Sequence, residues 1–204
     1  VLSAVAVCLG MCQLGFACTG IRVRSKDGAI IYARTLEFGI DLQSSILITP
    51  RDKKFAGTAP GGKPGLTWKS KYAAVGTNAY QYEVFLDGLN EKGLAVGLFY
   101  FPGYAKYQTI EKGEDKKTLA PHELGAFLLT TCSNTAEAVA AAQQIKVGEV
   151  VLKEFGFVPP AHYIIHDSKG DCRVLEYVGG ELRIHLNPLG VMSNAPTFDW
   201  HVTN

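Results

Sequence analysis

Cys18 is the first residue of the sequence whose position gives it special chemistry. It follows residues 1–17, VLSAVAVCLGMCQLGFA, which contain no Asp, Glu, Lys or Arg. Gly15 and Ala17 are small residues at the two positions that a signal peptidase reads just before its cut. The pattern is typical of a secretory signal, and cleavage after Ala17 makes Cys18 the amino-terminal residue of the mature chain.

An amino-terminal cysteine carries a nucleophile and a base on one residue. The reference pKa of a thiol is about 8.5 and that of an α-amine is about 7.7–8.0, so the two groups are nearly matched near neutral pH. The thiolate is then the nucleophile and the α-amine is the base beside it. The sequence therefore predicts nucleophilic catalysis by Cys18.

Two other interpretations of this segment stay open. Residues 1–17 could form a buried core helix, although a soluble helix needs a polar face and Ser3 and Gln13 offer little of one. Cys18 could instead be the diacylated cysteine of a lipoprotein, although Gly15 stands where such a signal normally has Leu. Acylation of the amine would remove the base, so the lipoprotein and nucleophile interpretations exclude each other.

The other cysteines have less specific roles. Cys8 and Cys12 lie in the predicted signal. The spacing of Cys132 and Cys172 does not decide whether an exported chain pairs them or keeps both as small buried hydrophobes. An odd number of cysteines in the mature chain leaves at least one thiol free, and Cys18 is the candidate.

The composition excludes several classes of protein. The length of 204 residues favours one domain or most of a larger one, and 47% hydrophobic residues with 19% charged residues are enough for a core. A net charge of +1 argues against a nucleic-acid binder. We find no apolar run of roughly 18 residues that suits a membrane span, and no His, Cys and carboxylate cluster with the spacing of a metal site. We therefore expect no metal and no cofactor.

The pattern after Cys18 predicts strands in two groups around a pair of helices, with Asn134 or Ser133 as N-cap of the second helix. Residues 51–63, RDKKFAGTAPGGK, have the composition of a loop. This grouping favours an α+β layered fold over a repeating βαβ fold. The expected strands are 21–25, 29–38, 44–49, 72–76, 84–87, 94–101, 163–167, 172–177 and 190–193, and the expected helices are 121–131 and 135–145.

Four motifs resemble the choloylglycine hydrolases, a family that includes bile salt hydrolases and penicillin V acylases. They are CTG at 18–20, ARTLEF at 33–38, DGLNEKGL at 87–94 and NPLGVMSNAPTFDW at 187–200, in the family's order. The resemblance implies the N-terminal-nucleophile hydrolase fold, a four-layer αββα sandwich. It also implies hydrolysis of a linear, non-peptide amide C–N bond.

The resemblance also implies roles for individual residues. Cys18 attacks the amide carbonyl and forms a thioester acyl-enzyme. Arg34, which would otherwise be interpreted as a solvated strand residue, favours the thiolate. The side chain of Asn194 and the backbone N–H of Tyr100 donate to the oxyanion, and one such donor is worth roughly 2.7–4 kcal/mol of barrier. The carboxylate of Glu37 holds the amine and the nucleophile in place.

At positions 37 and 100 the residue type differs from that found in some members of the family. Most members have Asp where this sequence has Glu37, and a displacement of about 1 Å in a catalytic group can cost roughly 10²-fold in rate. Bile salt hydrolases have Asn at the position of Tyr100, whereas penicillin V acylases have Tyr. The second departure favours an enzyme that resembles penicillin V acylase.

The implied substrate is a small N-acyl amide with an apolar acyl group. The aromatic residues that could line its pocket, or belong to an ordinary core, are Phe38, Trp68, Tyr80, Tyr82, Phe99 and Tyr100. The candidate substrates are penicillin V, N-acyl amino acids, N-acyl homoserine lactones and conjugated bile acids.

These inferences define the expected organisation of the chain. We expect residues 1–17 to be a signal peptide that is incomplete at its start, and residues 18–204 to be the amino-terminal part of one domain, truncated at its carboxyl end. We expect the protein to be exported, to the periplasm or the extracellular space, and a homo-oligomer is compatible with these inferences. An exported or lipid-anchored binding domain of the same fold without catalysis stays open, because Glu37 departs from the family pattern.

Overall fold

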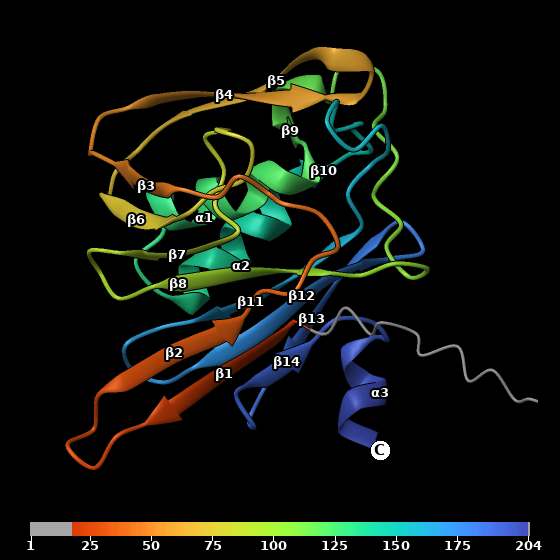
Figure 1. Cartoon of the computed structure of the whole chain (residues 1–204). Helices are drawn as coiled ribbons and strands as arrows, with labels where there is room; N and C mark the ends of the chain where they lie inside the picture. Colours follow the sequence, from red (N-terminus) through yellow and green to blue (C-terminus); the bar gives the residue numbers. More distant parts are fainter. Residues whose placement is uncertain (1–17, 204) are drawn as a thin grey trace, which may run out of the picture.

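The computed structural model describes residues 18–203, so the predicted signal at 1–17 lies outside the described residues. Its largest element is an antiparallel seven-stranded sheet, shown in Figure 1. In spatial order the strands are β13 (Glu181–Leu186), β12 (Cys172–Val178), β11 (Ala161–His166), β8 (Ala95–Tyr100), β7 (Asp87–Asn90), β6 (Ala74–Thr77) and β3 (Ile46–Thr49).

A second, three-stranded sheet packs on one face of the large sheet. Its central strand β1 (Thr19–Arg24) begins directly after Cys18 and lies between β2 (Ile30–Thr35) and β14 (Val191–Ser193). The register pairs Thr19 with both Thr35 and Ser193. The start of β1, the end of β2 and the end of β14 therefore meet at one point, although β14 is far away in the sequence.

Helices cover the opposite face of the large sheet. They are α1 (Leu124–Thr131) and α2 (Thr135–Gln144), while the short α3 (Phe198–Thr203) follows β14 (Figure 1). Strand β11 shows why both faces are buried. Tyr163 and Ile165 belong to the core on the helix side, whereas Ile164 belongs to the cluster between the sheets. Because successive strand residues point to opposite faces, such a strand is apolar on both sides.

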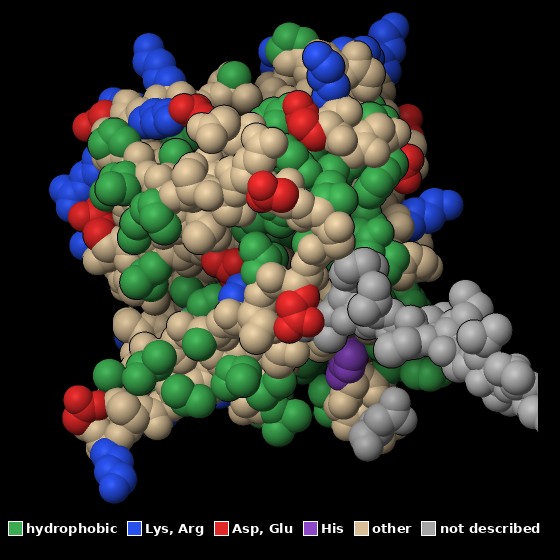
Figure 2. Space-filling model, viewed as in Figure 1, with side chains coloured by type: hydrophobic (Ala, Val, Ile, Leu, Met, Phe, Trp, Pro, Cys, Tyr) green, Lys and Arg blue, Asp and Glu red, His purple; other side chains and the backbone are tan. Residues whose placement is uncertain are grey.

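The layers confirm the predicted N-terminal-nucleophile fold class. Residues 18–203 supply three of the four layers of the predicted αββα sandwich: the helices, the seven-stranded sheet and the three-stranded sheet form an α-β-β arrangement. The outer face of the three-stranded sheet leaves Ile21, Val23, Ile31 and Val191 exposed. Figure 2 shows apolar side chains at the surface over this region. Among the described residues, every helix is too short or too polar to cross a membrane.

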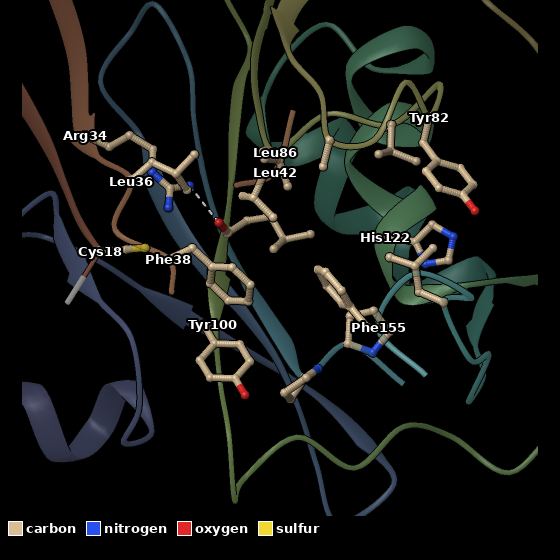
Figure 3. A pocket seen from close by; sticks show the side chains of 16 residues that line it. Cys18, Arg34, Leu36, Phe38, Leu42, Tyr82, Leu86, Tyr100, His122 and Phe155 are labelled. Atoms are coloured by element: carbon tan, nitrogen blue, oxygen red, sulfur yellow. Dashed lines mark hydrogen bonds between the residues drawn. The ribbon is translucent and has the colours of Figure 1, made fainter. Parts of the chain in front are cut away.

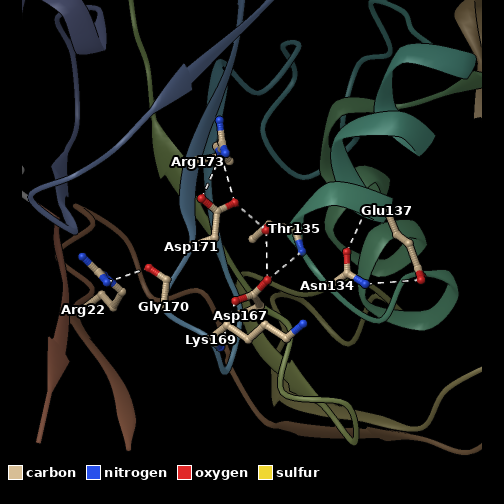
Figure 4. A network of polar contacts seen from close by, with 9 residues as sticks. All are labelled: Arg22, Asn134, Thr135, Glu137, Asp167, Lys169, Gly170, Asp171 and Arg173. Atoms are coloured by element: carbon tan, nitrogen blue, oxygen red, sulfur yellow. Dashed lines mark hydrogen bonds and ion pairs between the residues drawn. The ribbon is translucent and has the colours of Figure 1, made fainter. Parts of the chain in front are cut away.

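The turn between β11 and β12 connects all three layers, as Figure 4 shows. The hydroxyl of Thr135 at the start of α2 donates to Asp171 at 2.6 Å or to Asp167 at 3.0 Å. From the small sheet, Arg22 donates to the backbone carbonyl of Gly170 at 2.7 Å. The side chain of Asn134 accepts from the backbone N–H of residue 137, so of the two candidates, Ser133 and Asn134, the N-cap of α2 is Asn134.

The structure corrects the expectation for residues 51–63. Residues 54–59 of this segment form β4 (Lys54–Ala59), which pairs with β5 (Lys63–Lys69) after a tight turn in which Gly61 and Gly62 have positive φ. The rings of Phe55 and Trp68 stack with centroids 4.8 Å apart across this hairpin. The composition was misleading because glycines that look like loop residues here serve a hairpin turn.

Cys132 and Cys172 are free, buried thiols. Cys132 follows α1 in the core on the helix side, and Cys172 opens β12 in the cluster between the sheets. Of the two alternatives for this pair, the structure selects small buried hydrophobes.

Asn90 of the DGLNEKGL motif fixes the end of α1 to the β7–β8 hairpin. Its side-chain N–H groups donate to the carbonyls of Leu129 and Cys132 at 2.8 and 2.7 Å. Its side-chain oxygen accepts from the backbone N–H groups of Lys92 and Leu94 at 2.9 and 3.0 Å. With 4% of its surface exposed, Asn90 is a buried polar group with every hydrogen bond made.

We predict that Asn90→Ala lowers the free energy of unfolding of the full-length protein by about 2 kcal/mol or more, because two buried carbonyls lose their donors. Urea denaturation measures this loss. Asn134→Ala, which removes a helix cap and two local side-chain hydrogen bonds at the surface, is the control and should cost about 1 kcal/mol. An equal or smaller loss for Asn90→Ala than for the control contradicts the prediction.

Candidate active site

The thiol of Cys18 is buried at the junction of the three strands of the small sheet. Cys18 is 2% exposed, and its Sγ lies 3.6 Å from the backbone carbonyl of Glu37 as a hydrogen-bond donor. Its own carbonyl accepts a hydrogen bond of 2.9 Å from the hydroxyl of Ser193. Cys18, the nucleophile expected from the sequence, is therefore positioned by β1, which it directly precedes, and by a hydrogen bond from β14.

Cys18 lines an apolar pocket, shown in Figure 3. Cys18 and Arg34 are at one end, and Tyr82 and His122 are at the other. The side chains between the two ends are carbon surfaces from several elements. They are Leu36, Phe38, Leu42, Ala79, Val84, Leu86, Leu98, Tyr100, Leu152, Phe155, Pro159 and Pro160.

Half of the expected pocket aromatics line this pocket. They are Phe38, Tyr82 and Tyr100. Tyr80 packs edge-on against Phe155 with ring centroids 5.7 Å apart, so it supports the wall from behind. Trp68 belongs to the β4–β5 hairpin, and Phe99 is fully buried between the sheets. The leucines and prolines of the pocket could not be predicted from the sequence, because a leucine or proline that lines a pocket has the same local pattern as one in the core.

Arg34 is buried at the pocket end that holds the thiol. Its side chain is 7% exposed, forms an ion pair of 2.9 Å with Asp87 and donates to the backbone carbonyl of Leu98 at 2.6 Å. The guanidinium also lies over the ring of Phe99, 4.1 Å from the centroid. The interpretation of Arg34 as a solvated strand residue is therefore wrong.

Asp87 and Tyr32 complete a buried cluster that sequence reasoning missed. The carboxylate of Asp87 accepts a second hydrogen bond from the Tyr32 hydroxyl at 3.0 Å. Burial raises the pKa of Asp87 to about 6, against the opposing effect of Arg34. Two signals were available: Asp87 opens the DGLNEKGL motif, and Tyr32 stands two residues before Arg34, on the same face of its strand.

Asn194 and Tyr100, the two oxyanion donors that the family resemblance implies, are hydrogen-bonded to each other in the structure. The backbone N–H of Tyr100 donates to the side-chain oxygen of Asn194 at 3.1 Å, and the N–H of Ala195 lies 3.3 Å from the Tyr100 carbonyl. The N–H expected to bind an oxyanion is thus engaged by Asn194 in this structure. A substrate oxygen at that point has to replace the Asn194 oxygen as its acceptor.

Glu37 presents its main chain to the site and its side chain to solvent. Within residues 18–203 its carboxylate makes no hydrogen bond or ion pair. Contact of this carboxylate with the α-amine of Cys18 stays a prediction.

A buried carboxylate positions the segment after Asn194. Glu176 on β12 is fully buried; one of its oxygens contacts His162 Nδ1 at 3.1 Å, and the other lies 3.3 Å from His185 Nε2. The oxygen that contacts His162 also accepts from the backbone N–H of Phe198 at 2.8 Å, where α3 begins. Burial lowers the pKa of His162. This network had no sequence signal, because its members lie on separate strands.

We predict that ionisation of Asp87 makes the full-length protein less stable as the pH rises. Folding raises the pKa of Asp87 from 3.8 to about 6, so the folded state holds this proton more tightly. Its stabilisation is complete below pH 3.8 and is lost as the pH rises through about 6. Relative to Asp87→Asn, the wild type should lose up to about 3 kcal/mol between about pH 4 and about pH 7.

Urea denaturation across this pH range measures the difference. Asp52→Asn is the control, because a hydrogen bond with Lys69 lowers the pKa of Asp52 and the sign of its effect is opposite. Parallel pH profiles for the wild type and Asp87→Asn would show that the carboxyl group titrates normally, against the prediction.

Comparisons with known proteins identify the family of this chain. The family model described as linear amide C–N hydrolases, choloylglycine hydrolase family, matches residues 18–204. A bile salt hydrolase/transferase of Clostridium perfringens is 31% identical over 92% of this chain and 56% of its own length. A penicillin V acylase of Pectobacterium atrosepticum is 31% identical over 99% of this chain and 55% of its own length.

A solved structure shows the same fold. The conjugated bile acid hydrolase of Clostridium perfringens superposes with a TM-score of 0.78 at 28% identity, over 92% of this chain and 56% of that one. The chain therefore spans little more than half the length of the proteins that it matches. The match of a family model across residues 18–204 shows that this chain belongs to the choloylglycine hydrolase family of linear amide C–N hydrolases.

Proposed function

We propose that the protein that contains this chain hydrolyses a linear amide bond by means of an amino-terminal Cys18. The observation that carries the proposal is the placement of one buried thiol at the end of an apolar pocket, beside Arg34 and near the Asn194–Tyr100 pair. A thiol, a cation and paired amide groups are the parts that acyl transfer through a thioester requires.

The reaction begins with transfer of the thiol proton to the α-amine of Cys18. The sulfur attacks the substrate carbonyl carbon, and the oxyanion that forms accepts hydrogen bonds from Asn194 and the N–H of Tyr100. Collapse of this intermediate breaks the C–N bond, and the leaving amine takes the proton from the ammonium group. Water, deprotonated by the same α-amine, then attacks the thioester and releases the carboxylic acid and the free thiol.

The pocket supports an apolar acyl group. Its carbon-rich walls gain about 25 cal/mol for each Å² of apolar surface that a ligand buries there. The relatives named above are a bile salt hydrolase/transferase and a penicillin V acylase, so conjugated bile acids and penicillin V are the first substrates to test. Tyr100 in the pocket wall favours penicillin V.

The proposal includes export of the protein, because residues 1–17 have the pattern of a secretory signal that is cleaved after Ala17.

A second candidate is an exported or lipid-anchored binding domain of the same fold without catalysis. The exposed side chain of Glu37 favours it, since a carboxylate in solvent does not hold an amine in place. The lipid-anchored form of this candidate has an acylated amine at Cys18, whereas the hydrolase requires a free amine.

We predict that Cys18→Ala in the full-length protein abolishes hydrolysis of amide substrates by at least about 10³-fold, because the acyl-enzyme cannot form. Turnover of penicillin V and of a conjugated bile acid measures this. Cys132→Ala changes another buried thiol, far from the pocket, and should retain turnover. Equal rates for Cys18→Ala and the wild type refute the assignment.

We also predict that one extra residue ahead of Cys18 inactivates the enzyme, because the amine becomes an amide and loses its basicity. Turnover before and after proteolytic removal of that residue tests this. Intact-mass analysis of the secreted protein should give a chain that starts at Cys18 without added groups. A diacylglyceryl mass, or full activity with the extra residue in place, contradicts the mechanism.

A further inference from the structure

At the end of the pocket remote from the Cys18 thiol lies His122, whose Nδ1 has no hydrogen-bond partner among the described residues. His122 lies in the short 3₁₀ segment Pro121–Glu123, just before α1. Figure 3 shows its ring across the pocket from Cys18, with the apolar side chains of Leu42 and Phe155 between them. Both ends of the pocket thus carry polar groups, whereas the walls between them are apolar.

The imidazole of His122 makes a ring contact but no side-chain hydrogen bond within the described part of the chain. Its Nδ1 is buried and has no hydrogen-bond partner among residues 18–203. The neighbouring Tyr82 faces it edge-on, with ring centroids 6.3 Å apart, but the Tyr82 hydroxyl donates to Glu154 at 2.6 Å. A buried nitrogen without a partner costs about 1–3 kcal/mol, so a ligand that supplies a partner recovers part of this cost.

The ring is also in the right state to bind a neutral group. Burial lowers the pKa of His122 to about 4, against the weaker opposite effect of Glu154. At neutral pH the imidazole is therefore uncharged, with one nitrogen as donor and the other as acceptor. Such a ring suits a hydroxyl or carbonyl oxygen rather than a carboxylate.

We propose that His122 is a specificity residue that hydrogen-bonds an oxygen at the far end of the acyl group. The preferred substrates are then N-acyl amides whose acyl group is apolar along its length and carries a hydroxyl or carbonyl oxygen remote from the scissile bond. This inference rests on the proposed function, because it assumes that the pocket beside Cys18 holds the acyl group. An acyl group without the oxygen leaves the imidazole unpaired and binds less well.

The test compares N-acylglycines with and without a terminal hydroxyl over a series of chain lengths, using the full-length enzyme. At the length that reaches His122, we expect the hydroxylated substrate to have a kcat/KM about 2- to 10-fold higher than its unsubstituted partner. In His122→Leu this ratio should fall below one, because the hydroxyl is then buried without a partner. Taking the ratio within each variant cancels differences in the amount of folded protein.

Two further variants sharpen the test. His122→Gln keeps a donor and an acceptor and should retain a preference for the hydroxylated substrate. Phe155→Leu changes the apolar wall and should alter both rates while leaving their ratio close to that of the wild type. A ratio that is the same in the wild type and His122→Leu, or that favours the unsubstituted substrate at every length, overturns the inference.

A binding measurement separates this inference from the proposed function. Calorimetry with Cys18→Ala compares fatty acids with their terminally hydroxylated counterparts, with and without the additional His122→Leu change. Loss of the hydroxyl preference on changing His122 supports the inference even if no amide is hydrolysed. Absence of turnover for every amide contradicts the proposed function, and absence of any hydroxyl preference in binding contradicts the inference.

Discussion

The buried ion pair between Arg34 and Asp87 joins the two sheets at the site. Arg34 comes from β2 of the small sheet, and Asp87 begins β7 of the large sheet. Moving both charges out of water is expensive, and the pair repays this only because Tyr32 and the Leu98 carbonyl satisfy further groups. The arrangement fixes a cation beside the thiol. Such a pair adds little to stability by itself, and its partners come from β2 and β7, so it connects the small sheet to the large one.

The same packing explains why the thiol lies in dry surroundings. Cys18 belongs to a buried cluster with Phe99 and Met192, which the two sheets form between their facing sides. On the pocket side it faces apolar carbon. Electrostatic effects are stronger where water is excluded, so charges and dipoles near the sulfur act with more force there than in solvent, as the proposed mechanism requires. The fold thereby supplies a setting that an exposed amino-terminal cysteine lacks.

The segment that carries Asn194 is held by residues that do not line the pocket. Glu176 accepts the backbone N–H of Phe198, and His201 contacts the Asn194 carbonyl at 2.9 Å. These contacts fix the backbone at Asn194 and at the start of α3. The amide is therefore a feature of a rigid framework, which is what preorganised stabilisation of charge requires.

Much of the fold follows from local patterns in the sequence. Alternation of apolar residues located most strands, and the N-cap at Asn134 located the second helix, because these signals depend on neighbours a few residues away. The hairpin at β4 and β5 was missed, since pairing of the two strands and stacking of Phe55 on Trp68 outweigh a loop-like composition. The edge strand β13, with its half-exposed polar residues, has a weak pattern and was also missed.

The sequence by itself indicated the chemistry that is available: a cysteine after an uncharged apolar segment, and motifs that contain Arg34 and Asn194. Only the tertiary structure decided which groups act on one another. Arg34 and Asp87 are 53 positions apart, and Tyr100 and Asn194 are 94 positions apart. Pairing of distant strands brings such residues together, and burial then sets their charge and hydrogen-bonding state. The role inferred for His122 likewise depends on a pocket whose walls come from segments that no local pattern connects.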